Sequence, residues 1–511
     1  MLETRWGAYV AIEVEAARRS VRVLRDPTGR IECWKLSLEG LDVIFSHYED
    51  VQWLQPRRSP INWDYVAYHL NNDWLRGDET GLEDISEVLP GEELLYLDGR
   101  PSKSRPWRPD KIAAERFATM DEAQRAIRQA AESAVTEWAA RYGTIALDLS
   151  GGLDSSIVLG LLKRCAKHPN VVGANWVIAH AEGDERAFAR AAAELHGVRL
   201  IEAEISPENL RFGAPVAHRL MRPSIRSMPL GYDERGAQIA KEIGADAYFT
   251  GTAGDHIFYD YLQVNAGSDY LHDRAPLGGA IGTAHQLAQV SKNTIWSVCG
   301  AALSDYVGGP KPLHQMFKNR NPFAAHEMSE AELNRFIHPW AHDGLHHTPP
   351  AKLQQVLNIS ELQRHYWRYG RADVSEEVHP LFSQPLVEAC LRTPAYWFCA
   401  GGIQRGLARR IFSDLLPASI RTRRTKGANT SHWVRVMTQN LPHVRELMLE
   451  GHLASRGLLN RARMEEELTP LAMAAAKAQG PLAVCLTTEI WIQQTEANRG
   501  RSAPSGTLMA V

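Results

Sequence analysis

The chain has 511 residues, of which 44% are hydrophobic and 23% charged, and its formal net charge is −3. This length predicts two or more domains, and this composition is typical of a globular protein. The balanced charge gives no general attraction to nucleic acid, and no apolar run approaches the roughly 20 residues that cross a bilayer. We therefore expect neither nucleic acid nor a membrane among its partners.

The six cysteines are scattered along the chain, and no two of them form a C-x-x-C pair. This pattern argues against a disulfide framework and against a structural zinc site. The amino-terminal residues Met1–Trp6 do not resemble a signal peptide. Together these features predict a cytoplasmic location.

Residues 1–100 predict short β-strands joined by turns. Polar and apolar residues alternate in the first two expected strands, and Pro and Gly mark the turns at Arg25–Arg30 and Leu89–Gly91. Residues 101–112 are rich in Pro, Arg and Lys and predict a linker. The expected strands are Tyr9–Val14, Ser20–Leu24 and Glu93–Leu97.

Residues 120–142 carry a helical pattern, and strand and helix patterns alternate beyond them. Such alternation predicts an α/β fold in which helices flank a parallel sheet. Ligands in such sheets bind at the carboxyl ends of the strands. Strands are expected near 144–149, 171–179 and 246–250, and helices near 154–166, 184–196 and 232–243.

The most informative segment is Thr144–Val158, where an apolar run stops at a glycine turn and a helical pattern begins at once. Such a junction exposes backbone N–H groups and the positive end of a helix dipole, which together bind phosphate. Glycines let the backbone approach the ligand, and an aspartate can hold Mg²⁺ against the phosphates. The Gly-Lys-[Ser/Thr] ending of a Walker loop is absent. The predicted phosphate-binding residues are Ser150, Gly151, Gly152, Asp154, Ser155 and Ser156.

A second glycine-rich segment, Thr250–Phe258, follows another expected strand. Carboxylates at neighbouring strand ends can share the magnesium ions of an ATP–Mg complex, so Asp154 and Asp255 are the predicted metal ligands. Gly251 and Gly254 are predicted to contact the nucleotide. The alternative for this segment alone is an ordinary strand–helix turn with an N-cap aspartate.

The block Ser-Gly-Gly-Leu-Asp-Ser-Ser resembles the pyrophosphate loop of the ATP pyrophosphatases, in the asparagine-synthetase branch. The resemblance implies that ATP is cleaved between its α and β phosphates and that a carboxylate is adenylated. Leu149 and Ile178 are candidates to flank the adenine ring, because each lies at a strand end. Thr252 and His256 stand where the synthetases have glutamates, so this chain departs from asparagine synthetases in its acid–base residues.

The C-terminal third has helical patterns and two further blocks that resemble the same family. Residues 378–388 resemble a Val-Pro-Phe-Leu-Asp block, which implies that Glu376 lies near the reacting groups. Residues 405–427 resemble the block that ends in a catalytic lysine, which implies that Lys426 stabilises charge developing on pyrophosphate. Without that context, the basic run is typical of a solvated face near a helix end. Three candidates remain for the base that deprotonates the attacking amine: Glu376, His256 and His379.

The N-terminal region resembles the tail of a class II glutamine amidotransferase domain, on Arg25–Gly29 and Gly81–Gly91. In that family an amino-terminal cysteine is the glutaminase nucleophile. Here Leu2 follows Met1 and the first cysteine is Cys33, so the resemblance implies a degenerate domain that draws no ammonia from glutamine.

These resemblances divide the chain into two predicted domains. Residues 1–110 are the truncated, degenerate, β-rich glutaminase-like domain. Residues 120–511 are an asparagine-synthetase-like PP-loop domain, with a parallel sheet flanked by helices, a helical C-terminal part and an insertion at about 259–365.

The whole chain is most similar to the lasso peptide cyclases. That resemblance implies that ATP adenylates the side-chain carboxylate of an Asp or Glu in a precursor core peptide. The N-terminal amine of the peptide then forms an isopeptide macrolactam, with release of AMP and PPi. The implied partners are the core peptide, a leader-peptide-binding protein and a leader peptidase. The segments that carry this resemblance are Trp6–Val10, Val23–Gly29, Gly254–Phe258, Val378–Leu381 and Thr425–Gly427.

Two alternatives remain open on the sequence alone. One is another AMP-forming amide ligase, such as a β-lactam-synthetase-like enzyme or an asparagine-synthetase-like enzyme without glutaminase activity. The other is an inactive scaffold that binds a peptide. Aromatic residues of the insertion are candidates to wall a peptide cavity, or else they pack a helical core of their own. They are Tyr259, Tyr261, Tyr270, Trp296, Tyr306, Phe317, Phe323, Phe336 and Trp340.

Overall fold

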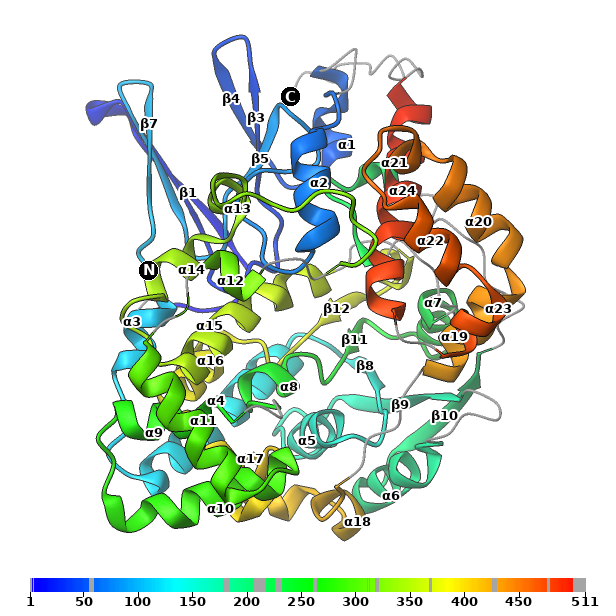
Figure 1. Ribbon diagram of the computed structural model, residues 1–511. Coiled ribbons are helices and arrows are strands. Elements are labelled where there is room, and N and C mark those ends of the chain that lie inside the picture. The colour runs from blue at the N-terminus through cyan, green and yellow to red at the C-terminus, as the bar shows by residue number, and fades with distance from the viewer. Residues whose placement is uncertain are drawn as a thin grey trace.

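A parallel five-stranded sheet lies at the centre of the computed structural model (Figure 1). The strands lie in the order β10-β9-β8-β11-β12, and every neighbouring pair is parallel. The direction of the strand order reverses between β8 and β11, and open parallel sheets bind ligands at such a switch point. The strands are β8 (Thr144–Asp148), β9 (Asn170–Val177), β10 (Arg199–Glu204), β11 (Ala247–Phe249) and β12 (Glu376–Val378).

The structure describes most of the 511 residues. None of the helices in this described part combines the length and the apolar character that a bilayer crossing would require. The structure describes residues 2, 4–54, 59–177, 184–205, 217–225, 232–260, 264–309, 311, 313–317, 321–366, 370–424, 430–475 and 478–499.

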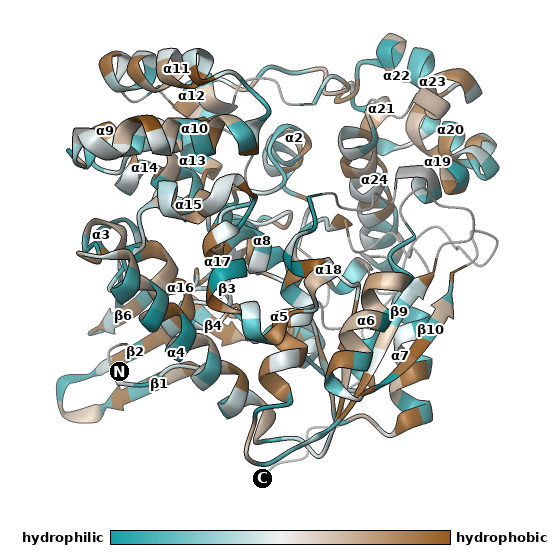
Figure 2. Cartoon of the chain, turned by 90° about the horizontal axis from the view of Figure 1, so that it is seen from below, coloured by the Kyte–Doolittle hydropathy of each residue, from teal (hydrophilic) through white to brown (hydrophobic). Residues whose placement is uncertain are grey.

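Helices cover the parallel sheet because its strands are apolar on both faces. Ile145, Ala146 and Leu147 of β8 are fully buried, as expected for a central parallel strand. All residues of helix α5 except Asp154 are buried, whereas hydrophilic and hydrophobic residues alternate along helix α4 (Figure 2). The predicted α/β fold is confirmed. The helices between these strands and before them are α4 (Met120–Ala139), α5 (Leu153–Leu162), α6 (Arg186–His196) and α7 (Tyr232–Ile243).

The N-terminal region forms two antiparallel sheets, which confirms the prediction of a β-rich start. One sheet has the order β1-β2-β6-β7 and the other the order β4-β3-β5. Their strands are β1 (Val10–Glu15), β2 (Ser20–Arg25), β3 (Trp34–Leu38), β4 (Leu41–Phe45), β5 (Ile85–Glu87), β6 (Glu93–Leu97) and β7 (Arg100–Ser104), with helices α1 (Tyr48–Val51) and α2 (Trp63–Asn71) inserted.

The prediction of a linker at residues 101–112 is wrong. Most of β7 and most of helix α3 (Pro109–Ala114) fall within that range. Every residue of β7 is exposed, and β7 is the edge strand of its sheet. Pro, Arg and Lys are tolerated on an exposed edge strand, so the composition that predicted a linker is also that of a sheet edge.

The N-terminal sheets share a hydrophobic core with the C-terminal helices. Leu36 and Val66 pack in the same buried cluster as Val444 and Trp491. Gly81 permits this contact, because a Cβ at that position would lie 2.5 Å from the ring of Trp491. The N-terminal sheets and the C-terminal helices therefore fold against each other.

Helices form the rest of the molecule. Those of the predicted insertion are α8 (Gly254–Ile257), α9 (Ala266–His272), α10 (Ala280–Ser291), α11 (Ile295–Gly308), α12 (Leu313–Phe317), α13 (Glu330–Phe336), α14 (Pro339–Gly344) and α15 (Pro350–Leu362). Those that follow β12 are α16 (Gln384–Arg392), α17 (Gly406–Ile411), α18 (Ala418–Arg421), α19 (Thr430–Gln439), α20 (Leu441–Glu450), α21 (His452–Ser455), α22 (Arg461–Glu467), α23 (Pro470–Ala475) and α24 (Gln479–Arg499).

Candidate functional site

The predicted phosphate loop joins β8 to α5, as the sequence indicated. Gly152 is the N-cap of α5, and its N–H donates to Ser150 Oγ at 3.2 Å. Gly151 has φ +74°, and a Cβ there would lie 2.6 Å from the backbone nitrogen of Ala189. Only glycine fits this turn without strain. The loop therefore presents the amino end of a buried helix at the carboxyl edge of the sheet.

The serines of the loop have different roles. Ser155 Oγ lies 3.2 Å from Ser150 Oγ, and both residues line a cavity. Ser156 is fully buried, and its hydroxyl donates to Gly152 O at 2.7 Å. Ser150 and Ser155 therefore offer hydroxyls to a ligand, while Ser156 holds the first turn of the helix.

The second predicted loop, between β11 and α8, packs directly on the first. A Cβ at Gly251 would lie 2.5 Å from the backbone nitrogen of Ser155, and one at Gly254 would overlap the carboxylate of Asp154. The absence of side chains at Gly251 and Gly254 thus brings Asp255 toward Asp154. This confirms that the two loops meet, at the switch point between β8 and β11.

A cavity of about 300 Å³ lies where the two loops meet. Its wall combines loop residues with arginines from the C-terminal helical region, so it carries charges of both signs. The lining residues are Asp148, Ser150, Gly152, Leu153, Asp154, Ser155, Trp176, Thr250, Gly251, Thr252, Asp255, Arg405, Arg409, Ile420 and Arg423.

Arg405 links the two predicted metal ligands. Its Nη1 donates to Asp154 Oδ2 at 2.5 Å and also to Asp255 Oδ1, and its Nη2 lies 3.4 Å from Asp260 Oδ2. Burial opposes the charge of Arg405, but the three carboxylates outweigh burial and raise its pKa above the ordinary value. Arg405 itself has a left-handed backbone conformation, with φ +54°, and it immediately precedes α17.

Two more arginines complete the positive wall of the cavity. Arg409 donates to the carbonyl oxygens of Gln404 and Ile420, and burial, together with Arg405, lowers its pKa to about 10. Arg423 donates to Glu185 at 2.6 Å and lies 3.9 Å from the centre of the Phe188 ring. These fixed guanidinium groups suit a ligand with several negative charges.

Several residues of the cavity were not predicted from the sequence. Asp148 accepts from the Trp176 indole at 3.0 Å and from Arg371 at 3.0 Å, which holds the indole at the cavity wall. Arg405, Arg409 and Arg423 lie in the block that resembles the lysine-containing segment, so that block was a usable signal. No sequence signal identified Trp176, which is one of several aromatic residues at expected strand ends.

His256 and His379 lie beside the cavity but do not line it. His379 Nδ1 is 2.7 Å from Thr250 Oγ1, and Thr250 is a lining residue. His256 follows Asp255, and its Nε2 lies 3.6 Å from Glu361 Oε2. Both rings are at the carboxyl edge of the sheet, where the reaction would take place.

Glu376, the first candidate for the base, is not brought to the site. It begins β12, so it lies at the amino edge of the sheet, opposite the loops. Its carboxylate accepts from Arg30 at 2.6 Å and from Tyr142 at 2.6 Å. Burial would raise its pKa, but these two partners lower it, which makes Glu376 a weak base as well as a distant one.

Leu149, a candidate to flank adenine, is not among the residues that line the cavity. Its side chain is fully buried in the core and packs over Gly173, where an added Cβ would lie 3.2 Å from Leu149 Cδ2. Ile178 and Lys426 lie outside the described residues, so their predicted roles stay predictions. Arg423, three positions before Lys426, lines the cavity.

The donor set fits an ATP–Mg complex. Mg²⁺ is usually bound by one or two carboxylates together with substrate phosphates, and Asp154 and Asp255 supply two carboxylates in one cavity. Within the described part of the chain, no group of three or more His, Cys, Asp or Glu residues is placed to hold a metal ion. Gly152 and the amino end of α5 face the same cavity and can accept phosphate.

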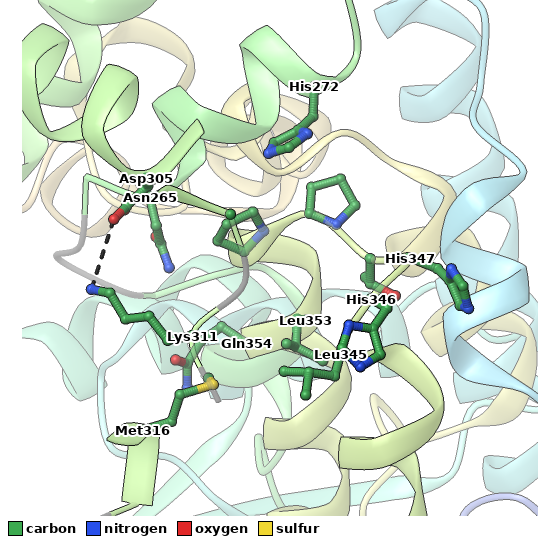
Figure 3. A pocket seen from close by; sticks show the side chains of 14 residues that line it. Asn265, His272, Asp305, Lys311, Met316, Leu345, His346, His347, Leu353 and Gln354 are labelled. Atoms are coloured by element: carbon green, nitrogen blue, oxygen red, sulfur yellow. Dashed lines mark ion pairs between the residues drawn. The ribbon is translucent and has the colours of Figure 1, made fainter. Parts of the chain in front are cut away.

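A second cavity, of about 270 Å³, lies within the predicted insertion (Figure 3). Helices α9, α11, α12 and α15 contribute to it. Its wall is largely apolar and includes His272, His346 and His347, while Lys311 Nζ lies 3.8 Å from Asp305 Oδ1.

Most of the insertion's aromatic residues pack a core instead of walling a cavity. Tyr259, Tyr270, Phe323, Phe336 and Trp340 are buried in hydrophobic clusters, which confirms the alternative for these five. Trp296 and Tyr306 are exposed. Tyr261 and the side chain of Phe317 lie outside the description.

A sequence model of the asparagine synthase family matches residues 126–493. The match covers more than half of the chain and takes in the parallel sheet, both glycine loops and the arginines of the cavity. No curated protein sequence matches the chain.

Proposed function

The chain belongs to the asparagine synthase family, and from this premise we propose that it is a lasso peptide cyclase. The family assignment makes it an ATP-dependent amide-forming ligase of the asparagine synthetase type. The proposal adds the substrate: a precursor core peptide whose Asp or Glu side chain is adenylated and then attacked by the N-terminal amine of the same peptide.

The observation that carries the ATP chemistry is the meeting of the two glycine loops in one cavity. ATP with Mg²⁺ supplies an activated phosphate and an AMP leaving group. Gly152 and the amino end of α5 hold phosphate oxygens, and Asp154 and Asp255 hold the metal. Arg409 and Arg423 stabilise the charge that develops on the leaving pyrophosphate. Trp176 provides an apolar wall for the adenine ring of ATP.

The amine in this proposal comes from the peptide because Cys33, the cysteine of the N-terminal sheets, is poorly suited to act as a glutaminase nucleophile. Cys33 is the first cysteine in the sequence, and it is buried. Burial raises the pKa of its thiol to about 11, so the reactive thiolate is scarce near neutral pH. Ammonia from glutamine is therefore not the expected nucleophile.

We assign the general base to His256. It is adjacent to Asp255, and Glu361 is placed to orient its ring through Nε2. A histidine is suited to accept a proton near neutral pH. His379 is buried behind Thr250 and is better placed to orient that hydroxyl than to reach an amine.

The insertion supplies the proposed peptide-binding part. Its second cavity is largely apolar and lies apart from the phosphate loops, so it can take a side chain of the folded peptide. A leader-peptide-binding protein and a leader peptidase belong to the same proposal as partners that deliver the core peptide.

Mass spectrometry of a reconstituted reaction tests the proposal. The purified chain is incubated with ATP, Mg²⁺ and a linear core peptide encoded beside its gene. Loss of one water from the peptide, with a fragment pattern showing an isopeptide ring, is the expected result. If AMP is formed while the peptide mass stays unchanged, the chain adenylates a different acceptor, as a β-lactam-synthetase-like ligase would. If neither product forms with several neighbouring peptides, the cyclase proposal is wrong.

A further inference from the structure

A third cavity, of about 60 Å³, lies between the N-terminal sheets and the end of α15. It is separate from the phosphate loops, and four arginines line it: Arg25, Arg76, Arg222 and Arg364. Its size excludes a nucleotide but accepts one small polar group, since a water molecule occupies about 30 Å³ of liquid.

The carboxylates of this cavity are already engaged. Glu87 accepts from Arg25 at 2.6 Å and also from Arg222, so both of its oxygens are used. Glu32 accepts from the Trp34 indole at 3.3 Å. Arg364 pairs with Asp73 at 2.5 Å and with Glu361 at 2.5 Å, through its two terminal nitrogens.

Three donor groups on the cavity wall remain unused among the described residues. Arg76 has neither an ion pair nor a hydrogen bond there, and burial followed by repulsion from Arg222 lowers its pKa. Arg364 Nε and the side-chain nitrogen of Gln363 are buried without an acceptor. Buried donors are normally satisfied, so the Arg364 and Gln363 donors, beside an Arg76 guanidinium with no ion pair among the described residues, indicate a missing acceptor.

Among the described residues, neither Arg364 Nε nor the Gln363 side-chain nitrogen has an acceptor. The segments that border the cavity in sequence, 226–231 and 367–369, contain no Asp or Glu. A guanidinium and an amide that converge on a small space match the planar oxygens of a carboxylate, or those of a phosphate. We propose that this cavity is a binding site for one oxyanion group, held by Arg76, Arg364 and Gln363.

The site is connected to the catalytic side of the molecule. Arg364 shares Glu361 with His256, whose Nε2 lies 3.6 Å from the other oxygen of that carboxylate. An oxyanion bound at Arg364 would therefore weaken the ion pair between Arg364 and Glu361. The inference concerns binding alone and does not depend on the proposed cyclase activity.

Thermal unfolding of the full chain without ATP tests the site. Sodium acetate and inorganic phosphate are titrated separately, with NaCl keeping the ionic strength constant. We expect a saturable rise in melting temperature for the wild type. Arg76→Met should abolish that rise and should itself melt above the wild type in NaCl alone, because it removes a buried charge that has no partner. Gln363→Met should weaken the response, and Arg100→Met, at an exposed position in β7, should leave it unchanged.

Two peptides distinguish the sources of the oxyanion. A core peptide with a free C-terminal carboxylate and the same peptide with a C-terminal amide compete against ¹³C-labelled acetate in an NMR titration. Competition by the acid form alone identifies a peptide terminus, and competition by neither identifies a free small anion. The site is rejected if the wild type shows no saturable response, or if Arg76→Met responds as the wild type does. ATP cleavage by the same variants reports separately on the proposed function.

Discussion

At the scale of single residues, the site depends on one arginine shared by acidic side chains. Arg405 contacts Asp154, Asp255 and Asp260, and two of these are the candidate Mg²⁺ ligands. The guanidinium therefore lies beside the carboxylate oxygens that would bind the cation. Metal binding and the Arg405 contacts compete for the same oxygens.

This competition predicts the behaviour of Arg405→Met. Three carboxylates lose their contact with Arg405, which should cost about 2–3 kcal/mol of stability after allowing for the partly exposed Asp255. Millimolar Mg²⁺ should restore more of the melting temperature in the variant than in the wild type, and ATP cleavage should fall about 100-fold. Arg410→Met, at an exposed position on α17, is the control. A variant as stable as the wild type and insensitive to Mg²⁺ would contradict this account.

Residue patterns in the sequence predicted some of the site but not all of it. Asp154 and Asp255 were found because each follows a strand and a glycine turn, and that local pattern is visible in the chain. Arg405 was not singled out, because its contacts join residues about 150 to 250 positions away. Glu376 was misplaced because its position just before the block 378–388 in the sequence says nothing about which edge of the sheet it occupies.

At the scale of elements, two loops determine the geometry of the site. The loop after β8 and the loop after β11 touch through glycine backbone, so a single methyl group would separate them. The strand–helix alternation that positions both loops was predicted from periodicity. The short strand β12 was not predicted, because its residues Glu376–Val378 form no apolar run of the kind that marks β11.

The fit between the loops predicts a selective effect of Gly254→Ala. The added Cβ would overlap the Asp154 carboxylate and displace it from Arg405 and from the phosphates. Since a displacement of about 1 Å can cost 100-fold in rate, ATP cleavage should fall at least that far while circular dichroism stays unchanged. Gly300→Ala is the matched control, because nothing lies within 4 Å of its Cβ and it sits inside α11. Full activity in Gly254→Ala would show that the loops are not tightly fitted.

At the scale of the whole molecule, buried ion pairs join the N-terminal sheets to the segment after β10. Glu87 of β5 pairs with Arg25 and with Arg222. Burial would raise the pKa of Glu87, but the Arg222, Arg25 and Arg76 guanidinium groups lower it from 4.5 to about 2. Composition could not reveal this joint, because its members lie far apart in the sequence.

The depressed pKa of Glu87 predicts how stability responds to acid. Its ionised form is favoured by folding, so the stabilisation is complete above about pH 4.5 and is lost as the pH falls toward 2. That difference corresponds to about 3 kcal/mol. Glu87→Gln should lower the urea midpoint at pH 7 and flatten its dependence on pH below 4.5, whereas Glu83→Gln, at an exposed position, should behave as the wild type. A Glu87→Gln variant with the same acid sensitivity would refute the role of this joint.

The central claim is that the cavity between the two glycine loops cleaves ATP into AMP and pyrophosphate. The most direct measurement separates the products of α-³²P-labelled ATP after incubation with the chain, Mg²⁺ and a core peptide. The account predicts labelled AMP from the wild type and from Asp121→Asn, an exposed control, and a loss of at least about 100-fold in Asp154→Asn. Labelled ADP as the product, or equal rates of AMP formation in the wild type and Asp154→Asn, would contradict it.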